Sequence, residues 1–135
     1  MQSQQDEALQ KIEALSRNGG RYRTQAYFFI LTALEFTARK LERHDKEGRE
    51  RHVTGQELSH GIKEYALQEF GPTARLVFTH WGINSTYDFG RIVYDLIGVG
   101  LLGKNDEDSM DDFKDVFDMD KEMVVNYRFK LPKKK

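Results

Sequence analysis

The fold is decided by residues 54–100, which read TGQELSHGIKEYALQEFGPTARLVFTHWGINSTYDFGRIVYDLIGVG. Thr54 and Glu57 have the spacing of a capping box, in which each side chain accepts a hydrogen bond from a free backbone N–H of the helix start. This pair predicts that a helix begins here. Its inward face is predicted by apolar residues at helical spacing, namely Leu58, Ile62, Tyr65, Ala66 and Phe70. Gly71 and Pro72 predict where this helix ends.

Two further helices are expected in the same stretch. The first is short, runs over residues 73–80 and ends at Gly82, a residue suited to the left-handed conformation that closes many helices. Ser85 and Asp88 then form a second capping signal. It begins a helix over residues 86–98 whose inward face is Phe89, Ile92, Val93, Leu96 and Ile97.

The order of these three helices is that of a winged helix-turn-helix, with residues 86–98 as the third helix and residues 101–118 as the wing. The expected fold class is therefore mainly α, a helical domain with a winged-helix-like C-terminal half over residues 54–119. A plain five-helix bundle with a terminal strand explains the same periodicities about as well. Both alternatives stay open at this point.

The segment after the third helix has a less regular pattern. Residues 105–119 could form a small wing hairpin, but Ser109 and Asp112 have a capping spacing that would equally begin a helix. Beyond it, apolar residues alternate with polar ones at the period of a half-buried strand, at Val125, Tyr127, Phe129 and Leu131. Residues 120–135 are therefore expected to form a terminal strand and a basic tail.

Two additional helices are expected before residue 54. Residues 4–16 carry Ala8, Leu9, Ile12 and Leu15 at helical spacing. The helix predicted from residue 23 to about residue 43 has an apolar stripe, and Phe28, Phe29 and Phe36 fall outside that stripe. This helix is therefore either central in the fold or part of an oligomer interface. The charged residues 44–52 are expected to form an exposed connection.

The length of 135 residues is that of one domain. We expect a single domain over residues 1–135, composed of an N-terminal helix (1–20), a central helix (21–43), a winged-helix-like unit (54–119) and a terminal segment (120–135). No cysteine is present, which excludes disulfides, thiolate nucleophiles and Cys-ligated metal centres. No apolar run reaches the length of a membrane span and no signal pattern is evident, so the expected location is the cytoplasm.

Nearly the whole chain, from about Tyr22 to Met119, resembles a family of small uncharacterised proteins described from planctomycetes and verrucomicrobia. The residues that carry the resemblance are His52–Leu58, Gly61-Ile62, Tyr65–Leu67, Glu69–Pro72, Trp81-Gly82, Asp88–Gly90 and Gly100–Leu102. The resemblance implies a bacterial cytoplasmic protein. Because this family has no assigned activity, cofactor or catalytic residue, the resemblance carries no site residue to this chain.

Residues that carry catalysis or bind metals do not converge in the sequence. Glu57 and His60 form one Glu-x-x-His pair, but a di-iron bundle needs a second copy. No serine lies in a Gly-x-Ser-x-Gly elbow. Residues 98–103 match Gly-x-Gly-x-x-Gly, yet they follow a predicted helix where a dinucleotide motif follows a strand. We therefore expect no catalytic, cofactor-binding or metal-binding residues and no cofactor.

Charge is segregated along the chain although the net charge is only -1. Residues 21–52 hold eight Lys or Arg against five acids, and residues 105–122 hold nine acids against two lysines. Residues 123–135 hold five bases and no acid. Such blocks are most often solvated faces, but they can also steer an oppositely charged partner.

Nucleic acid is one such partner. The predicted third helix offers Arg91 beside Asp88 and Asp95, and the wing is acidic, so docking in the usual winged-helix pose would meet phosphate repulsion. Another basic surface stays available, formed by Arg21, Arg23, Arg39, Lys40, Arg43, Arg49 and Arg51 together with the C-terminal tail.

Our leading hypothesis is a non-enzymatic protein-interaction or regulatory module that binds a protein partner or another copy of itself. The alternative is a protein that binds DNA, RNA or the ribosome through the basic surface at residues 21–52 and the C-terminal tail. A third hypothesis is an enzyme with dispersed acid–base residues such as Glu57, His60 and His80.

Overall fold

The computed structural model describes residues 4–47, 52–105 and 108–126. In this part of the chain there are five α-helices, α1 (Gln4–Gly19), α2 (Thr24–Lys40), α3 (Gly55–Phe70), α4 (Ala74–Trp81) and α5 (Thr86–Gly98). Shorter helical turns are the 3₁₀ turns Gly71–Thr73 and Met110–Phe113 and the π-helical turn Lys121–Val125. The prediction of a mainly helical fold is confirmed. None of the described helices combines the length and the apolar character that crossing a membrane requires.

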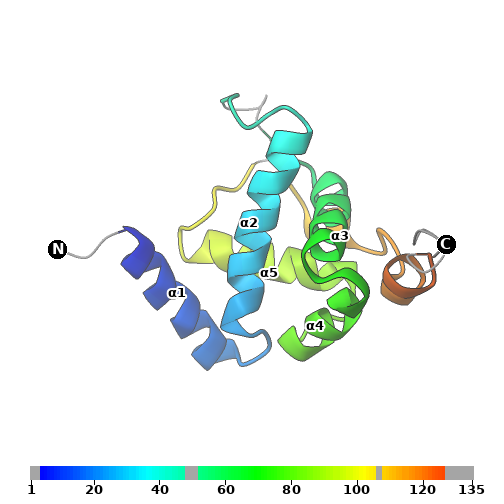
Figure 1. Ribbon diagram of the computed structural model, residues 1–135. Helices are drawn as coiled ribbons and strands as arrows, with labels where there is room; N and C mark the ends of the chain where they lie inside the picture. The colour runs from blue at the N-terminus through cyan, green and yellow to red at the C-terminus, as the bar shows by residue number, and fades with distance from the viewer. Residues whose placement is uncertain (1–3, 48–51, 106–107, 127–135) are drawn as a thin grey trace.

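Helix α2 occupies the centre of the fold (Figure 1), with α1 on one side, α3 on the other and α5 crossing it. The Phe29 ring lies 5.1 Å from the Tyr65 ring and belongs to an aromatic cluster with Phe70, Phe78 and Trp81. Phe36 packs on Tyr65 at 5.0 Å between ring centroids. Two of the three phenylalanines outside the predicted stripe are thus covered within the chain, which favours a central helix over an oligomer interface.

Helices α2 and α3 approach each other closely where Gly61 faces Thr37. A Cβ atom placed on Gly61 would lie 1.8 Å from the Thr37 Oγ1 atom. The Thr37 hydroxyl is held in place because it donates a 2.7 Å hydrogen bond to the Ala33 carbonyl one turn earlier. Gly61 therefore lets the two helices meet at a distance that any side chain would prevent.

The predicted capping boxes are present. The Glu57 N–H donates to Thr54 Oγ1 at 3.1 Å, and the Thr54 N–H donates back to Glu57 Oε1 at 3.0 Å. Ser85 and Asp88 cap α5 in the same way. Gly82 ends α4 with a φ of 92°, the left-handed conformation expected of it. These local signals set the starts and ends of α3, α4 and α5.

Of the two alternatives for residues 105–119, the described part shows the capped helical turn and not the wing hairpin, since it contains no strand. A capping box at Ser109 begins the 3₁₀ turn Met110–Phe113 instead. The backbone there is satisfied by a side chain of α5, since the Thr86 hydroxyl donates to the Phe113 carbonyl at 2.7 Å and accepts from the Val116 N–H at 3.1 Å. These bonds take the place of a ladder between two strands.

The predicted terminal strand is wrong at its first residue. Val125 belongs to the helical turn Lys121–Val125, which is started by hydrogen bonds from the Lys121 and Glu122 N–H groups to Asp118. The rest of the predicted strand, Tyr127, Phe129 and Leu131, lies outside the described residues, as does the basic tail.

Candidate functional site

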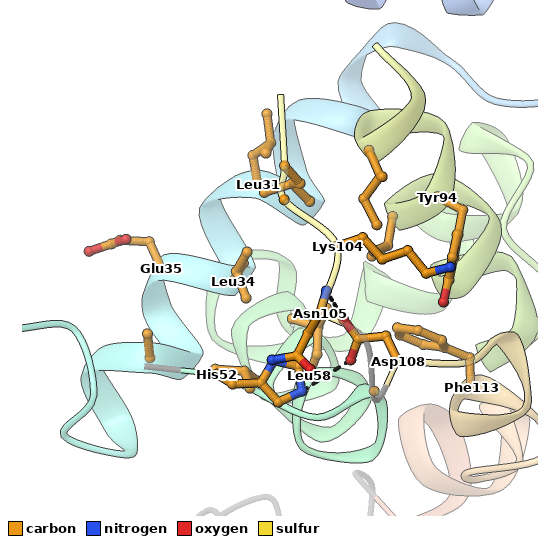
Figure 2. A pocket seen from close by; sticks show the side chains of 17 residues that line it. Leu31, Leu34, Glu35, His52, Leu58, Tyr94, Lys104, Asn105, Asp108 and Phe113 are labelled. Carbon is orange, nitrogen blue, oxygen red and sulfur yellow. Dashed lines mark hydrogen bonds and ion pairs between the residues drawn. The ribbon is translucent and has the colours of Figure 1, made fainter. Parts of the chain in front are cut away.

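An open pocket of about 780 Å³ lies between α2, α5, the start of α3 and the segment that follows α5 (Figure 2). Its apolar lining comes from five places in the sequence, and the larger apolar side chains are Leu31, Leu34, Val53, Leu58, Val93, Ile97, Leu102 and Phe113. The polar lining is Glu35, His52, Tyr94, Lys104, Asn105 and Asp108.

The apolar wall follows from helical spacing. Leu31, Leu34 and Ala38 are three and four residues apart on α2, so they share one face of that helix. Val93 and Ile97 are four residues apart on α5 and also line the pocket. The segment after α5 adds Leu102, Lys104 and Asn105 to the lining between these two helix faces.

A histidine–aspartate pair lies among the polar residues of the pocket lining. His52 Nε2 lies 3.0 Å from Asp108 Oδ1, and both side chains are about four-fifths buried. The other carboxylate oxygen, Oδ2, accepts a 3.1 Å hydrogen bond from the Asn105 N–H. The His52–Asp108 pair connects the residues before α3 to the loop after α5. Both oxygens of the Asp108 carboxylate therefore have partners.

Lys104 and Tyr94 form a second polar feature. The Lys104 ammonium lies 5.8 Å from the centre of the Tyr94 ring, a cation–π arrangement. Burial, followed by the charges of Asp108 and Asp112, raises the pKa of Tyr94. The phenol therefore stays protonated at neutral pH.

The described lining of the pocket contains mainly apolar side chains. No Ser or Thr is among the described residues that line the pocket, and the hydroxyl present there is the Tyr94 phenol. Among residues 4–47, 52–105 and 108–126 there is also no group of three His, Asp or Glu side chains that could hold a metal ion. What the pocket offers is a large apolar surface with a few polar groups.

The structure does not bring the predicted basic residues together. Arg21 and Arg23 precede α2, whereas Arg39, Lys40 and Arg43 lie at its other end. A helix of 17 residues at about 1.5 Å per residue separates the two groups by about 25 Å. Two remaining members of the predicted surface, Arg49 and Arg51, lie outside the described residues.

The basic residues at the end of α2 are also paired with carboxylates. Arg39 lies 3.5 Å from Glu35, Lys40 contacts Glu64, and Arg43 Nη1 donates to Glu57 Oε1 at 2.8 Å. These ion pairs are local links between α2 and its neighbours or within α2. The positive charges of Arg39, Lys40 and Arg43 are therefore partly neutralised by these carboxylates, which weakens their attraction for a phosphate group.

The dispersed acid–base residues serve separate contacts. Burial alone would raise the pKa of Glu57, but hydrogen bonds from Arg43 and from the Thr54 N–H lower it below the ordinary value. The His60 ring packs on the Phe117 ring at 5.6 Å. His80 lines a different hollow of about 460 Å³, which neither Glu57 nor His60 lines. No catalytic grouping of the three is formed.

Sequence reasoning missed the pocket and its polar residues. His52 was taken as the end of an exposed connection, yet its side chain is only 21% exposed because it contacts Asp108. The pair is separated by more than fifty residues in the sequence, so no spacing rule points to it. The available signal was weaker: Val93 and Ile97 belong to the expected inward face of residues 86–98, and Leu31 and Leu34 are apolar residues of the predicted central helix.

No match to this chain was found among protein-family models, curated proteins or solved structures. The class of protein is therefore inferred from the arrangement of the helices and of the pocket. The described residues form a helical domain with an amphipathic pocket between two of its helices.

Proposed function

We propose that this protein is a non-enzymatic binding module that holds the apolar part of a small ligand in the pocket between α2 and α5. The observation that carries the proposal is the pocket itself. Its volume of about 780 Å³ falls in the range of roughly 300–1,000 Å³ that is usual for small-molecule sites. Its lining, mostly apolar with a few polar groups, is also typical of such sites.

The driving force is the removal of the pocket walls from water. Leu31, Val93 and Ile97 are only partly buried, so a bound apolar group would cover side-chain surface that now contacts solvent. Each Å² of apolar surface removed from water contributes about 25 cal/mol. A ligand that binds only the folded chain also raises its stability, by about 2.7 kcal/mol at a concentration one hundred times the Kd. Ligand binding is thereby coupled to the stability of the folded chain, and a regulatory module can use such a coupling.

Titration with Nile red, a neutral apolar dye whose fluorescence rises in apolar surroundings, tests the proposal. In the variant Ile97→Trp the indole ring is expected to fill part of the pocket and to weaken dye binding at least tenfold. The matched control is Leu76→Trp, because Leu76 on α4 is 70% exposed and lies away from the pocket. Urea unfolding of both variants checks that the fold is retained.

Three outcomes decide the proposal. Dye binding that is lost in Ile97→Trp and kept in Leu76→Trp supports it. Binding that is unchanged in Ile97→Trp, or absent from the unmodified protein, contradicts it.

A protein partner remains a prediction, as does self-association. The exposed large apolar side chains among the described residues are Leu9, Phe28, Leu76 and Val125, which come from four different helical segments. Membership of the bacterial family indicated by sequence resemblance and a cytoplasmic location remain predictions too.

Nucleic-acid binding is the second candidate, and the specific observation in its favour is the helix order. Helices α3, α4 and α5 follow one another as in a helix-turn-helix, and a winged-helix-like arrangement of this unit stays a proposal. Arg91 on α5 is 44% exposed, but it lies 3.5 Å from Asp88 and over the Tyr87 ring. These contacts reduce its availability to bases or phosphates.

Fluorescence anisotropy of labelled duplex DNA and of single-stranded RNA at about 50 and about 200 mM salt tests this candidate, since phosphate contacts make affinity strongly salt-dependent. The double variant Arg21→Glu/Arg23→Glu is the informative one, because the structure shows neither residue in an ion pair with another described residue. Salt-sensitive binding that this variant abolishes would support nucleic-acid binding. No binding at micromolar protein would exclude this candidate.

A further inference from the structure

Polar groups occupy part of the pocket lining, and apolar side chains such as Leu58 and Phe113 lie next to them. Figure 2 shows Leu31 apart from the cluster formed by His52, Asn105 and Asp108, and Lys104 reaches toward Tyr94 beside that cluster. A molecule that fills the pocket therefore meets apolar side chains along one part and polar groups at another. Such a molecule has to be amphipathic, with an apolar body and a polar head.

The carboxylates of the pocket already have partners. Both oxygens of Asp108 are engaged, one by His52 and one by the Asn105 N–H. Glu35 lies 3.5 Å from Arg39 on the outer side of α2. A cationic head would have to compete with these contacts, so the pocket is poorly prepared for an amine.

The other polar groups of the pocket instead offer hydrogen-bond donors. Lys104 forms no ion pair with any described residue, and its ammonium is held over the Tyr94 ring beside the pocket. The Tyr94 phenol is protonated at neutral pH and can donate as well. An ammonium and a phenol on the same side of a pocket match an acceptor-rich anionic head.

We propose that the ligand of this pocket is an amphipathic carboxylate, whose apolar body lies against Leu31, Val93 and Ile97 and whose carboxylate is bound by Lys104. The proposal rests on the proposed function, since it assumes that the pocket takes up an apolar group. It adds the class of the ligand, a carboxylic acid with a hydrocarbon body such as a fatty acid, and it assigns the head group to one residue.

Competition with Nile red tests the assignment with two probes that share one apolar chain, dodecanoate and dodecanol. Each probe is kept below the concentration at which it aggregates. Dodecanoate is expected to displace the dye from the unmodified protein more effectively than dodecanol. In Lys104→Gln the affinity for dodecanoate should fall about tenfold, or about 1.4 kcal/mol, because the variant removes the cation that pairs with the carboxylate. The affinity for dodecanol should stay unchanged.

The matched control is Lys114→Gln, an exposed lysine that does not line the pocket. It removes the same charge and should leave both affinities as they are, which separates a specific contact from a change in the overall field of the protein.

The other outcomes distinguish this inference from the proposed function. Equal displacement by both probes, with no effect of Lys104→Gln, overturns the carboxylate assignment and leaves the apolar pocket in place. An equal loss for both probes in Lys104→Gln also overturns it, because Lys104 would then shape the pocket rather than pair with the head. Failure of both probes to displace Nile red from the unmodified protein overturns the inference, whereas the proposed function is overturned only if Nile red itself does not bind or binds Ile97→Trp unchanged.

Discussion

Helix α2 has a filled side and a hollow side. Toward α3 and α4 it packs closely, with Gly61 against Thr37 and the Phe29 ring inside an aromatic cluster. Toward α5 and the segment after it, the side chains of Leu31 and Leu34 face a pocket of about 780 Å³. Both sides are apolar, but the filled side carries the aromatic rings of Phe29 and Phe36, whereas the hollow side carries Leu31, Leu34 and Ala38.

The difference between the two sides comes from what lies opposite α2. On the filled side, a glycine on α3 lets the backbones approach and large rings occupy the remaining space. On the hollow side, the chain after α5 passes over the space, and Phe113 packs against Gly90 of α5 and Gly55 of α3 instead of against α2. A pocket forms where an apolar helix face lacks side chains of matching size opposite it.

The largest expected effect comes from Phe78→Ala on the filled side. Phe78 is fully buried between Phe29 and Phe89, with ring centroids at 5.9 and 5.7 Å. Deleting a buried phenylalanine ring typically lowers the free energy of unfolding by about 3–5 kcal/mol, because the lost contacts leave a cavity. Urea unfolding measures this loss. A change of less than about 1 kcal/mol would show that this side is not closely packed.

A smaller loss is expected from Gly61→Ala, which should reduce the free energy of unfolding by about 1–3 kcal/mol through overpacking against Thr37. Combining it with Thr37→Ala removes the hydroxyl and methyl that the new Cβ would meet. The double variant should therefore lose less than the sum of the two single losses in urea unfolding. Simple additivity would mean that α2 and α3 do not meet at these residues.

The next effect depends on pH. The Tyr22 hydroxyl donates to Asp88, and Tyr22→Phe should lower the free energy of unfolding by about 1 kcal/mol at neutral pH. Burial and the hydrogen bond to Asp88 raise the pKa of Tyr22 above the ordinary value of about 10. Because the folded-state pKa is the higher one, this stabilisation is present below about pH 10 and is lost as the pH rises further.

Urea unfolding at about pH 8 and at about pH 11 checks this sign, since the two values bracket the ordinary tyrosine pKa. Tyr22→Phe should lose less stability between the two pH values than the unmodified protein does. Tyr27→Phe should behave similarly, because the Tyr27 hydroxyl donates to Asp95 at 2.8 Å and burial raises its pKa as well. An identical pH dependence in all three proteins would contradict the prediction.

The smallest effect is expected on the hollow side. Leu34 is only partly buried and borders open space, so Leu34→Ala removes little packing and should cost about 0.5–1 kcal/mol in urea unfolding, less than a fully buried leucine. It should nevertheless weaken Nile red binding. A loss as large as that of Phe78→Ala would mean that the hollow side is packed in solution.

The local part of the fold could be predicted from the sequence. The starts of α3 and α5 were found because a capping box needs only residues three apart, such as Thr54 with Glu57 and Ser85 with Asp88. The path of the segment after α5 could not be predicted. It depends on Thr86, whose hydroxyl binds the Phe113 carbonyl 27 positions further along the chain. The capping spacing of Ser109 and Asp112 indicated the local helical turn, but a local pattern does not specify the contact with Thr86.

The site could be predicted much less well. The apolar faces of α2 and α5 were expected, but the space between them depends on how distant segments pack. The contact between His52 and Asp108 joins two loops that look merely charged in the sequence. The predicted basic surface stays a prediction, and the structure places Arg21 and Arg43 beyond opposite ends of α2.

Methyl-selective NMR spectra recorded during a dodecanoate titration test most directly whether the ligand binds on the hollow side of α2. Methyl signals of Leu31, Leu34, Val93 and Ile97 should shift in proportion to saturation. Signals of Ile12 and Ile62, which are fully buried away from the pocket, should stay in place. Shifts confined to exposed methyl groups such as those of Leu76, or no shifts at all, would show that the ligand does not bind on the hollow side of α2.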